Sequence, residues 1–150
     1  MSTPMPASSA INPPPLPPEQ RARLIDAARI AQQRAYAPYS HYRVGAALLT
    51  ADGTIVTGGN VENSAFPATI CAERSAVVKA ISDGQREFVA VVVFTRDGGW
   101  PCGTCRQVLH EFAPHIRVIV ADEAGNSAEE ILDALLPHGF HLNDPNQPNR

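Results

Sequence analysis

A chain of 150 residues is long enough for one domain with a hydrophobic core and too short for two. Its 44% hydrophobic and 18% charged residues are ordinary for a globular protein, and a net charge of -3 without a basic stripe argues against a nucleic-acid-binding protein. No run approaches the roughly 18 apolar residues of a membrane span, and no basic segment followed by an apolar one indicates a secretory signal, so we expect no membrane partner.

The predicted elements follow a proline-rich segment. Residues 1–18 contain seven of the fourteen prolines and few residues to bury, which predicts a disordered N-terminal tail. Residues 19–35 carry apolar residues at helical spacing and predict a helix. Residues 44–50 and 54–60 flank an Asp-Gly pair, the favoured turn of a two-stranded hairpin.

The second half of the chain alternates helices and strands. The patterns predict a helix over residues 71–82, a strand over 88–94, a helix over 102–112 and a strand over 116–120. Ser127-Ala-Glu-Glu130 fits a capping box and predicts a final helix over 127–136. The order predicts an α/β layered domain with a mixed sheet over residues 19–142, followed by a flexible tail, 143–150.

Three cysteines make an odd count that does not suit a disulfide scaffold, so we expect a reducing, cytoplasmic location. Cys71 and the pair Cys102 and Cys105 stand at predicted helix starts, where unpaired N–H groups and the helix dipole stabilise thiolates. Three thiolates leave one tetrahedral position of a zinc ion open, as in a catalytic site. Glu73, two residues after Cys71, stands where a general acid and base is needed.

Two other interpretations use the same cysteines. A dithiol redox protein needs only Cys102 and Cys105, and leaves Cys71 without a role. A structural zinc site needs a fourth ligand, for which His110 and His115 are the candidates. The pattern Cys-x-Glu followed by Pro-Cys-x-x-Cys matches the signature of zinc deaminases and favours catalysis.

Zinc with three thiolates carries an excess negative charge, so a cation should lie beside the sulfurs. Arg74 follows Glu73 and Arg106 follows Cys105, and either guanidinium can donate to a thiolate. We favour Arg74 as the residue that offsets the charge of the ligands.

Four stretches carry a resemblance to a known family: Tyr39-Ser-His-Tyr-Arg-Val-Gly-Ala-Ala47, Gly59-Asn-Val-Glu-Asn63, Cys71-Ala-Glu-Arg74 and Pro101-Cys-Gly-Thr-Cys-Arg-Gln-Val108. With them, residues 20–142 resemble the small, three-cysteine cytidine deaminases. The resemblance implies a three-layer α/β/α fold with a central mixed five-stranded sheet, and a homotetramer whose active sites are shared between subunits.

The same resemblance implies a reaction of pyrimidine salvage. Zinc held by Cys71, Cys102 and Cys105 would carry a hydroxide that attacks C4 of cytidine or 2′-deoxycytidine, releasing ammonia and the uridine product, while Glu73 moves the protons. The resemblance also assigns substrate contacts to five residues: Asn60 and Glu62 at the ribose 3′-hydroxyl, the Ala72 backbone and the Tyr42 ring at the base, and Phe140 in a neighbour's site.

Three positions depart from the family pattern. Tyr42 stands where the family usually has Phe, Phe66 where many relatives have Tyr, and Phe140-His-Leu142 where Phe-Gly-Pro is usual. Blasticidin S deaminases share the metal motif, and the Asn-Val-Glu-Asn element favours cytidine over their substrate. A carboxylate at Glu62 would repel a 3′-phosphate, which predicts a preference for free nucleosides over polynucleotides.

Overall fold

The elements below come from a computed structural model that describes residues 13–142; segments 1–12 and 143–150 of the two predicted tails lie outside the described residues. In chain order the elements are α1 (Pro18–Gln33), β1 (Gly45–Thr50), β2 (Ile55–Gly59), the 3-10 turn η1 (Phe66–Ala68), α2 (Ala72–Ser82), β3 (Phe88–Thr95), α3 (Gly103–Phe112), β4 (Arg117–Asp122), β5 (Ser127–Ile131) and α4 (Leu132–Leu135). No helix in this part of the chain is both long enough and apolar enough to cross a membrane.

One mixed sheet of five strands organises the domain, in the order β2-β1-β3-β4-β5. The pairs β2–β1, β1–β3 and β4–β5 are antiparallel, whereas β3 and β4 are parallel. Parallel neighbours need a crossover connection, and α3 provides it. The predicted three-layer α/β/α fold with a central mixed sheet is therefore confirmed.

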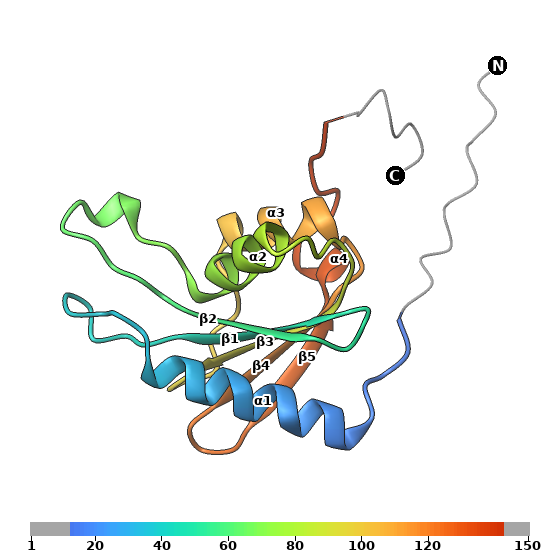
Figure 1. The fold of residues 1–150 in the computed structure, drawn as a ribbon, viewed down its shortest axis with the longest axis horizontal. Coiled ribbons are helices and arrows are strands. Elements are labelled where there is room, and N and C mark those ends of the chain that lie inside the picture. Colours follow the sequence, from blue (N-terminus) through green and yellow to red (C-terminus); the bar gives the residue numbers. More distant parts are fainter. Residues whose placement is uncertain (1–12, 143–150) are drawn as a thin grey trace.

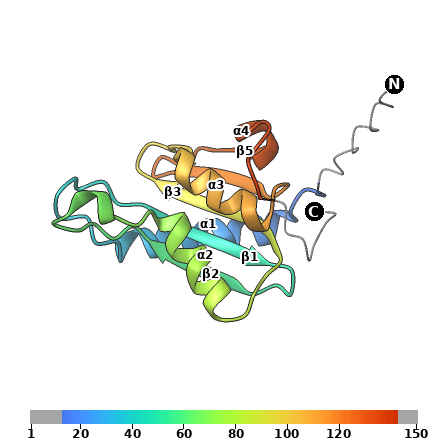
Figure 2. The ribbon, with the colours of Figure 1, turned by 90° about the horizontal axis from the view of Figure 1, so that it is seen from above.

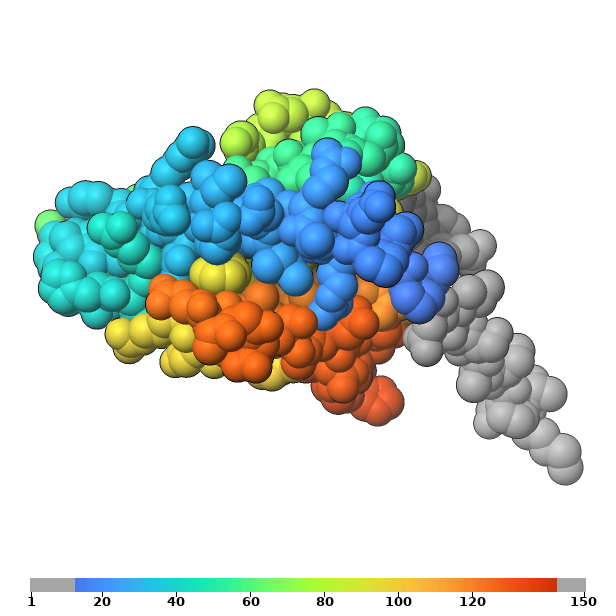
Figure 3. Space-filling view, turned by 90° about the horizontal axis from the view of Figure 1, so that it is seen from below, coloured from blue at the N-terminus to red at the C-terminus, as the bar shows by residue number. Residues whose placement is uncertain are grey.

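Helices cover both faces of the sheet. Helix α1 packs across β1, β2 and β3 on one face, and α2, α3 and α4 lie on the other (Figure 1, Figure 2). Seen from the α1 side, the blue residues that include α1 form a band across the molecule, with orange residues of the C-terminal part beside it (Figure 3). The three helices of the second face form one layer, in which α2 and α3 contact each other.

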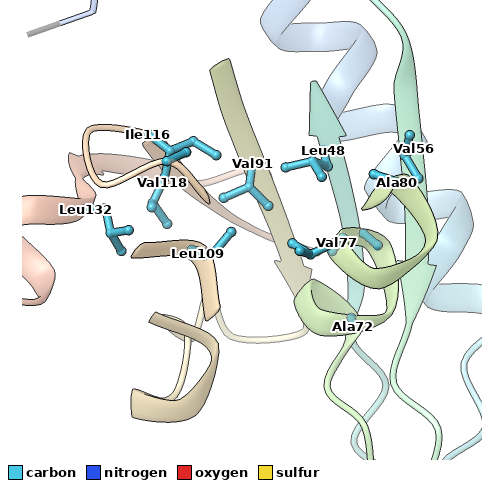
Figure 4. Close-up of a cluster of buried hydrophobic side chains, with 13 residues drawn as sticks. Leu48, Val56, Ala72, Val77, Ala80, Val91, Leu109, Ile116, Val118 and Leu132 are labelled. Atoms are coloured by element: carbon cyan, nitrogen blue, oxygen red, sulfur yellow. The ribbon is translucent and has the colours of Figure 1, made fainter. Parts of the chain in front are cut away.

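Side chains of the central strands alternate between two cores. Leu48 of β1 and Val91 of β3 face α2 and α3, where they pack with Leu109 (Figure 4). Their neighbours Leu49 and Val92 face α1. Burial on both faces explains why these strands are apolar throughout instead of alternating with polar residues.

Two glycines let helices approach the hairpin closely. A Cβ at Gly45 would lie 1.9 Å from the carbonyl oxygen of Ala28 in α1. A Cβ at Gly58 would lie 2.6 Å from the backbone nitrogen of Ala76 in α2. Any side chain at either position would push a helix off the sheet, so glycine is needed there for packing.

The predicted helix over residues 127–136 is wrong. Residues Ser127–Ile131 form β5, and only Leu132–Leu135 form a helix. Asp122 accepts hydrogen bonds from the backbone and side chain of Asn126, and Gly125 has φ of +89°, so the chain reverses tightly before Ser127. The reversal pairs the segment with β4 as an edge strand, and this pairing overrides the capping-box pattern.

Candidate active site

Three cysteine sulfurs meet at the starts of α2 and α3. The sulfurs of Cys71, Cys102 and Cys105 all lie within 4.8 Å of one another, and those of Cys71 and Cys102 are 3.9 Å apart. Four ligands at zinc–sulfur distance in a tetrahedron have sulfurs about 3.8 Å apart. The donor set therefore fits zinc, and no second group of three such ligands occurs among residues 13–142.

Local backbone geometry brings the three sulfurs together. Cys71 is the N-cap of α2 and Cys102 the N-cap of α3, each with an extended backbone, and Cys105 lies in the first turn of α3. The two helices contact each other on the same face of the sheet (Figure 2). Both N-caps lack a side-chain capping bond, so the thiols are available as ligands, and helix N-termini favour their charged form.

A hydrogen-bond network sets the charge of the sulfurs. The Cys105 thiol and then the Arg74 guanidinium, whose Nη2 is 3.2 Å from the Cys71 sulfur, lower the pKa of Cys71 to about 5. The same bond to Cys71, together with burial, raises the pKa of Cys105. Arg106 instead donates to the carbonyl oxygens of Pro101 and Leu135. Arg74, and not Arg106, is therefore the cation beside the sulfurs.

Neither histidine proposed as a fourth ligand reaches the sulfurs. His115 pairs with Asp133, and the ring of His110 packs against Gly139 and His141. The cysteine cluster includes no histidine among the described residues. A closed, structural zinc site is not built from these side chains.

Glu73 lies in the first turn of α2 beside the sulfurs. Its side chain is only 4% exposed, and this burial raises the pKa of its carboxyl group. A carboxyl group with a raised pKa can both take up and release a proton near neutral pH. The position and burial suit a proton-transfer group next to a metal.

A cavity of about 310 Å³ opens in front of these residues. Seven of the residues predicted for the site line it: Tyr42, Asn60, Glu62, Cys71, Ala72, Glu73 and Cys102. The volume is at the lower end of the range for small-molecule sites. Cys105 and Arg74 lie behind this wall and contact it through Cys71.

Asn60 and Glu62 are held by the segment before β1. Glu62, 4% exposed, accepts from the backbone N–H groups of Tyr39 and Ser40 at 2.9 and 3.1 Å and from the Ser40 hydroxyl, which lowers its pKa. The Asn60 amide joins the carbonyl of Tyr42 to the N–H of Val44. Each side chain keeps unused hydrogen-bonding capacity, since a carboxylate has about four acceptor sites and an amide two donors.

Phe140 does not line the cavity of its own chain. Its side chain is 68% exposed, and its carbonyl accepts a hydrogen bond of 2.7 Å from Gln107. The Phe140 side chain therefore takes no part in this cavity within one chain.

The sequence patterns missed several residues of the cavity wall: Ser40, Val44, Phe66, Thr69, Val93, Thr95, Gly99 and Trp100. Asp97 was missed as well, although its carboxylate accepts a hydrogen bond from the Tyr42 hydroxyl. One local signal could have indicated Asp97: it lies in a polar loop directly between a buried strand and the Pro-Cys-x-x-Cys motif.

Comparisons with known proteins agree with this geometry. Residues 18–122 match the family model described as the cytidine and deoxycytidylate deaminase zinc-binding region. A cytidine deaminase of Halalkalibacterium halodurans is 43% identical over 129 residues, 84% of this chain and 98% of the relative. One of Sporosarcina psychrophila is 46% identical over 125 residues, 81% of this chain and 92% of the relative.

A solved structure has the same fold. The crystal structure of cytidine deaminase from Burkholderia pseudomallei superposes with a TM-score of 0.78 at 41% identity, covering 79% of this chain and 98% of that one. The matched family model and the three clustered sulfurs identify zinc as the cofactor. The chain therefore belongs to the cytidine and deoxycytidylate deaminase family that shares this zinc-binding region.

Proposed function

We propose that the enzyme hydrolyses cytidine and 2′-deoxycytidine to uridine and 2′-deoxyuridine with release of ammonia, as a step of pyrimidine salvage. The observation that carries the proposal is one cavity whose wall includes two of the three clustered cysteines and the buried Glu73, together with Asn60 and Glu62. The reaction consumes one water and replaces the 4-amino group by oxygen, so atoms balance without an oxidant or a reductant.

The thiolates of Cys71, Cys102 and Cys105 would hold the zinc ion. When bound, zinc acts as a Lewis acid and lowers the pKa of its bound water to about 7. Glu73 takes the proton released from the attacking water and passes it to N3 of the pyrimidine. The same carboxyl group then takes the second proton of that water, from the new hydroxyl at C4, and gives it to the departing amine, and the raised pKa of Glu73 favours this proton uptake. Arg74 offsets the negative charge of the thiolates through its bond to Cys71.

The far side of the cavity would bind the sugar. Asn60 and Glu62 are proposed to hold the ribose 3′-hydroxyl with the hydrogen-bonding capacity they have left. Ionised Glu62 would repel a phosphate at that position, so free nucleosides are the expected substrates. The Tyr42 ring and the Ala72 backbone line the part of the cavity proposed for the base.

We further propose a homotetramer that works in a reducing cytoplasm. Large apolar side chains are exposed near the cavity: Tyr36 56%, Tyr39 52%, Val61 49%, Phe66 53% and Ile70 39%. Val61 forms backbone bridges with both Tyr36 and Ile70, so these three are adjacent, and a group of exposed apolar side chains is typical of a subunit interface. Within the tetramer, Phe140 would enter the site of a neighbouring subunit, and free thiol ligands favour a reducing compartment.

A substrate panel on protein of measured zinc content tests the proposal. We expect a loss of ultraviolet absorbance with cytidine and deoxycytidine, and little or none with cytosine, CMP, adenosine or blasticidin S. Glu73→Gln keeps the size of the side chain and should retain zinc while losing at least about 1000-fold in kcat, since proton transfer by this group is lost. Turnover of blasticidin S in preference to cytidine, or an active Glu73→Gln variant with full zinc, would contradict it.

A further inference from the structure

We propose that the hydrogen bond between the Tyr42 hydroxyl and the Asp97 carboxylate is a latch that fixes one wall of the nucleoside cavity. Asp97 is then a positioning residue, because it acts on the substrate through the Tyr42 ring. The inference rests on the function proposed above, since it assigns the wall a role in binding the base.

The latch joins two segments that are 55 residues apart in the sequence. Tyr42 precedes β1 and lines the cavity, while its hydroxyl donates to Asp97 in the loop between β3 and α3. The guanidinium carbon of Arg96 lies 4.9 Å from the centre of the same ring, a cation–π contact. One loop therefore holds both the face and the hydroxyl of Tyr42.

The loop itself is built to present Asp97. The hydroxyl of buried Thr95 donates to Asp97 at 3.2 Å and accepts from the N–H groups of Gly98 and Gly99 at 2.7 and 3.0 Å. A Cβ at Gly99 would lie 3.2 Å from the Tyr42 hydroxyl, so a side chain there would crowd the latch. The chain then continues to Cys102, which lines the same cavity.

The backbone of Tyr42 is anchored on the opposite side. Its carbonyl accepts from the Asn60 amide at 2.9 Å, and its N–H donates to the Ser40 hydroxyl oxygen at 3.0 Å. Ser40 in turn donates to Glu62. The network thus connects the proposed sugar-binding residues, through the Tyr42 ring, to the loop that leads to a zinc ligand.

Both groups of the latch have the protonation state that it needs. Burial and then the bond to Asp97 raise the pKa of Tyr42, so the hydroxyl keeps its proton through the neutral range. The hydrogen bond from Tyr42 lowers the pKa of Asp97, which stays ionised. A ring held in this way is ordered before the substrate arrives, so the cost of ordering it does not weaken binding.

The test compares Tyr42→Phe, Asp97→Ala and the double variant in the full-length, zinc-loaded enzyme; alanine is used because an asparagine oxygen could still accept the hydrogen bond from Tyr42. Each single variant should raise KM for cytidine by about 3- to 10-fold and leave kcat within about twofold, as expected for a lost hydrogen bond to a charged group that only positions a wall. The double variant should match the single variants, because all three remove the same bond.

Asp83→Ala is the matched control. It removes another exposed carboxylate, at the C-cap of α2 and about 15 Å along the helix from Glu73, and should leave KM unchanged. If Asp97→Ala fails to fold in a thermal melt, Tyr42→Phe, which keeps the ring, still decides the question.

A binding measurement gives a second readout without turnover. Trp100 is the one tryptophan of the chain and lines the cavity, so its fluorescence should report the titration with uridine. The dissociation constant of uridine should rise by the same 3- to 10-fold in Tyr42→Phe and Asp97→Ala.

The outcomes separate the latch from the proposed function. Unchanged KM and uridine binding in both single variants, or effects that multiply in the double variant, would overturn the latch. A fall in kcat or zinc content at constant KM would also overturn it, and would show that the loop only supports Cys102. A parent enzyme without activity on cytidine would instead overturn the proposed function.

Discussion

At the scale of single residues, the charge of the zinc site decides which arginine matters. Zinc with three thiolates carries a net charge of about -1, which opposes the release of a proton from water. The Arg74 guanidinium lies 3.2 Å from the Cys71 sulfur, whereas Arg106 is occupied by two carbonyl groups. Both arginines directly follow a motif residue, and only the packing of α2 and α3 distinguishes them.

Arg74→Gln should weaken the site through the loss of this charge. We expect zinc affinity to fall by about 10- to 100-fold, as is typical when a group that hydrogen-bonds a ligand is removed. The acidic limb of the kcat/KM profile should also move to higher pH, since the remaining negative charge favours protonated groups. Competition with a chelator measures the first effect and a pH–rate series the second.

Arg74→Lys serves as the control because it keeps the positive charge but lacks the planar guanidinium group. It should recover part of the zinc affinity and most of the pH profile. A Gln variant that binds zinc and turns over like the parent, with an unshifted profile, would show that Arg74 has no such role.

At the scale of elements, the sequence correctly predicted the turns and helix starts that depend on residues close together in the chain. The Asp-Gly turn set the β1–β2 hairpin, and Cys71 and Cys102 were correctly expected at helix starts. The pattern failed at residues 127–136, because pairing with β4 is a tertiary contact that a capping-box motif does not encode.

In the candidate site, too, short motifs were predictable from the sequence and a contact between distant segments was not. Spacing alone grouped Cys71, Cys102, Cys105 and Glu73, since metal ligation restricts residue type and position. The contact between Tyr42 and Asp97 crosses 55 residues and involves a loop without a regular pattern, so one sequence could not reveal it.

Gly58→Ala tests how closely α2 must approach the sheet. The new Cβ would lie 2.6 Å from the Ala76 nitrogen and 2.7 Å from the Ala72 carbonyl oxygen, both backbone atoms that cannot move alone. We expect a loss of about 1–3 kcal/mol in the free energy of unfolding. Because Cys71 directly precedes α2, zinc affinity should fall with it.

Gly103→Ala is the matched control for this change. Gly103 stands between two zinc ligands in the sequence, yet a Cβ there meets no atom within 4 Å. Stability should change by less than about 0.5 kcal/mol. Denaturant unfolding of the two variants would contradict the close-packing argument if Gly58→Ala were as stable as Gly103→Ala.

At the scale of the whole molecule, Phe140 tests the proposed link between catalysis and assembly. An aromatic side chain that is 68% exposed and lies outside its own cavity contributes little to the stability of one chain. If it completes a neighbour's site, Phe140→Ala should lower kcat/KM for cytidine while zinc content and melting temperature stay close to those of the parent.

Mixing two defective variants gives the decisive measurement, because subunit exchange lets them complement each other. A Phe140→Ala subunit keeps Glu73, and a neighbouring Glu73→Gln subunit supplies the missing aromatic ring, so one complete site forms at that contact. In an equal mixture, half of the subunits have Glu73. Half of those have a neighbour that still carries Phe140, so about a quarter of the parent activity should return. Activity no greater than the sum of the separate variants, in tetramers shown by native mass spectrometry to be mixed, would mean that each chain builds its active site alone.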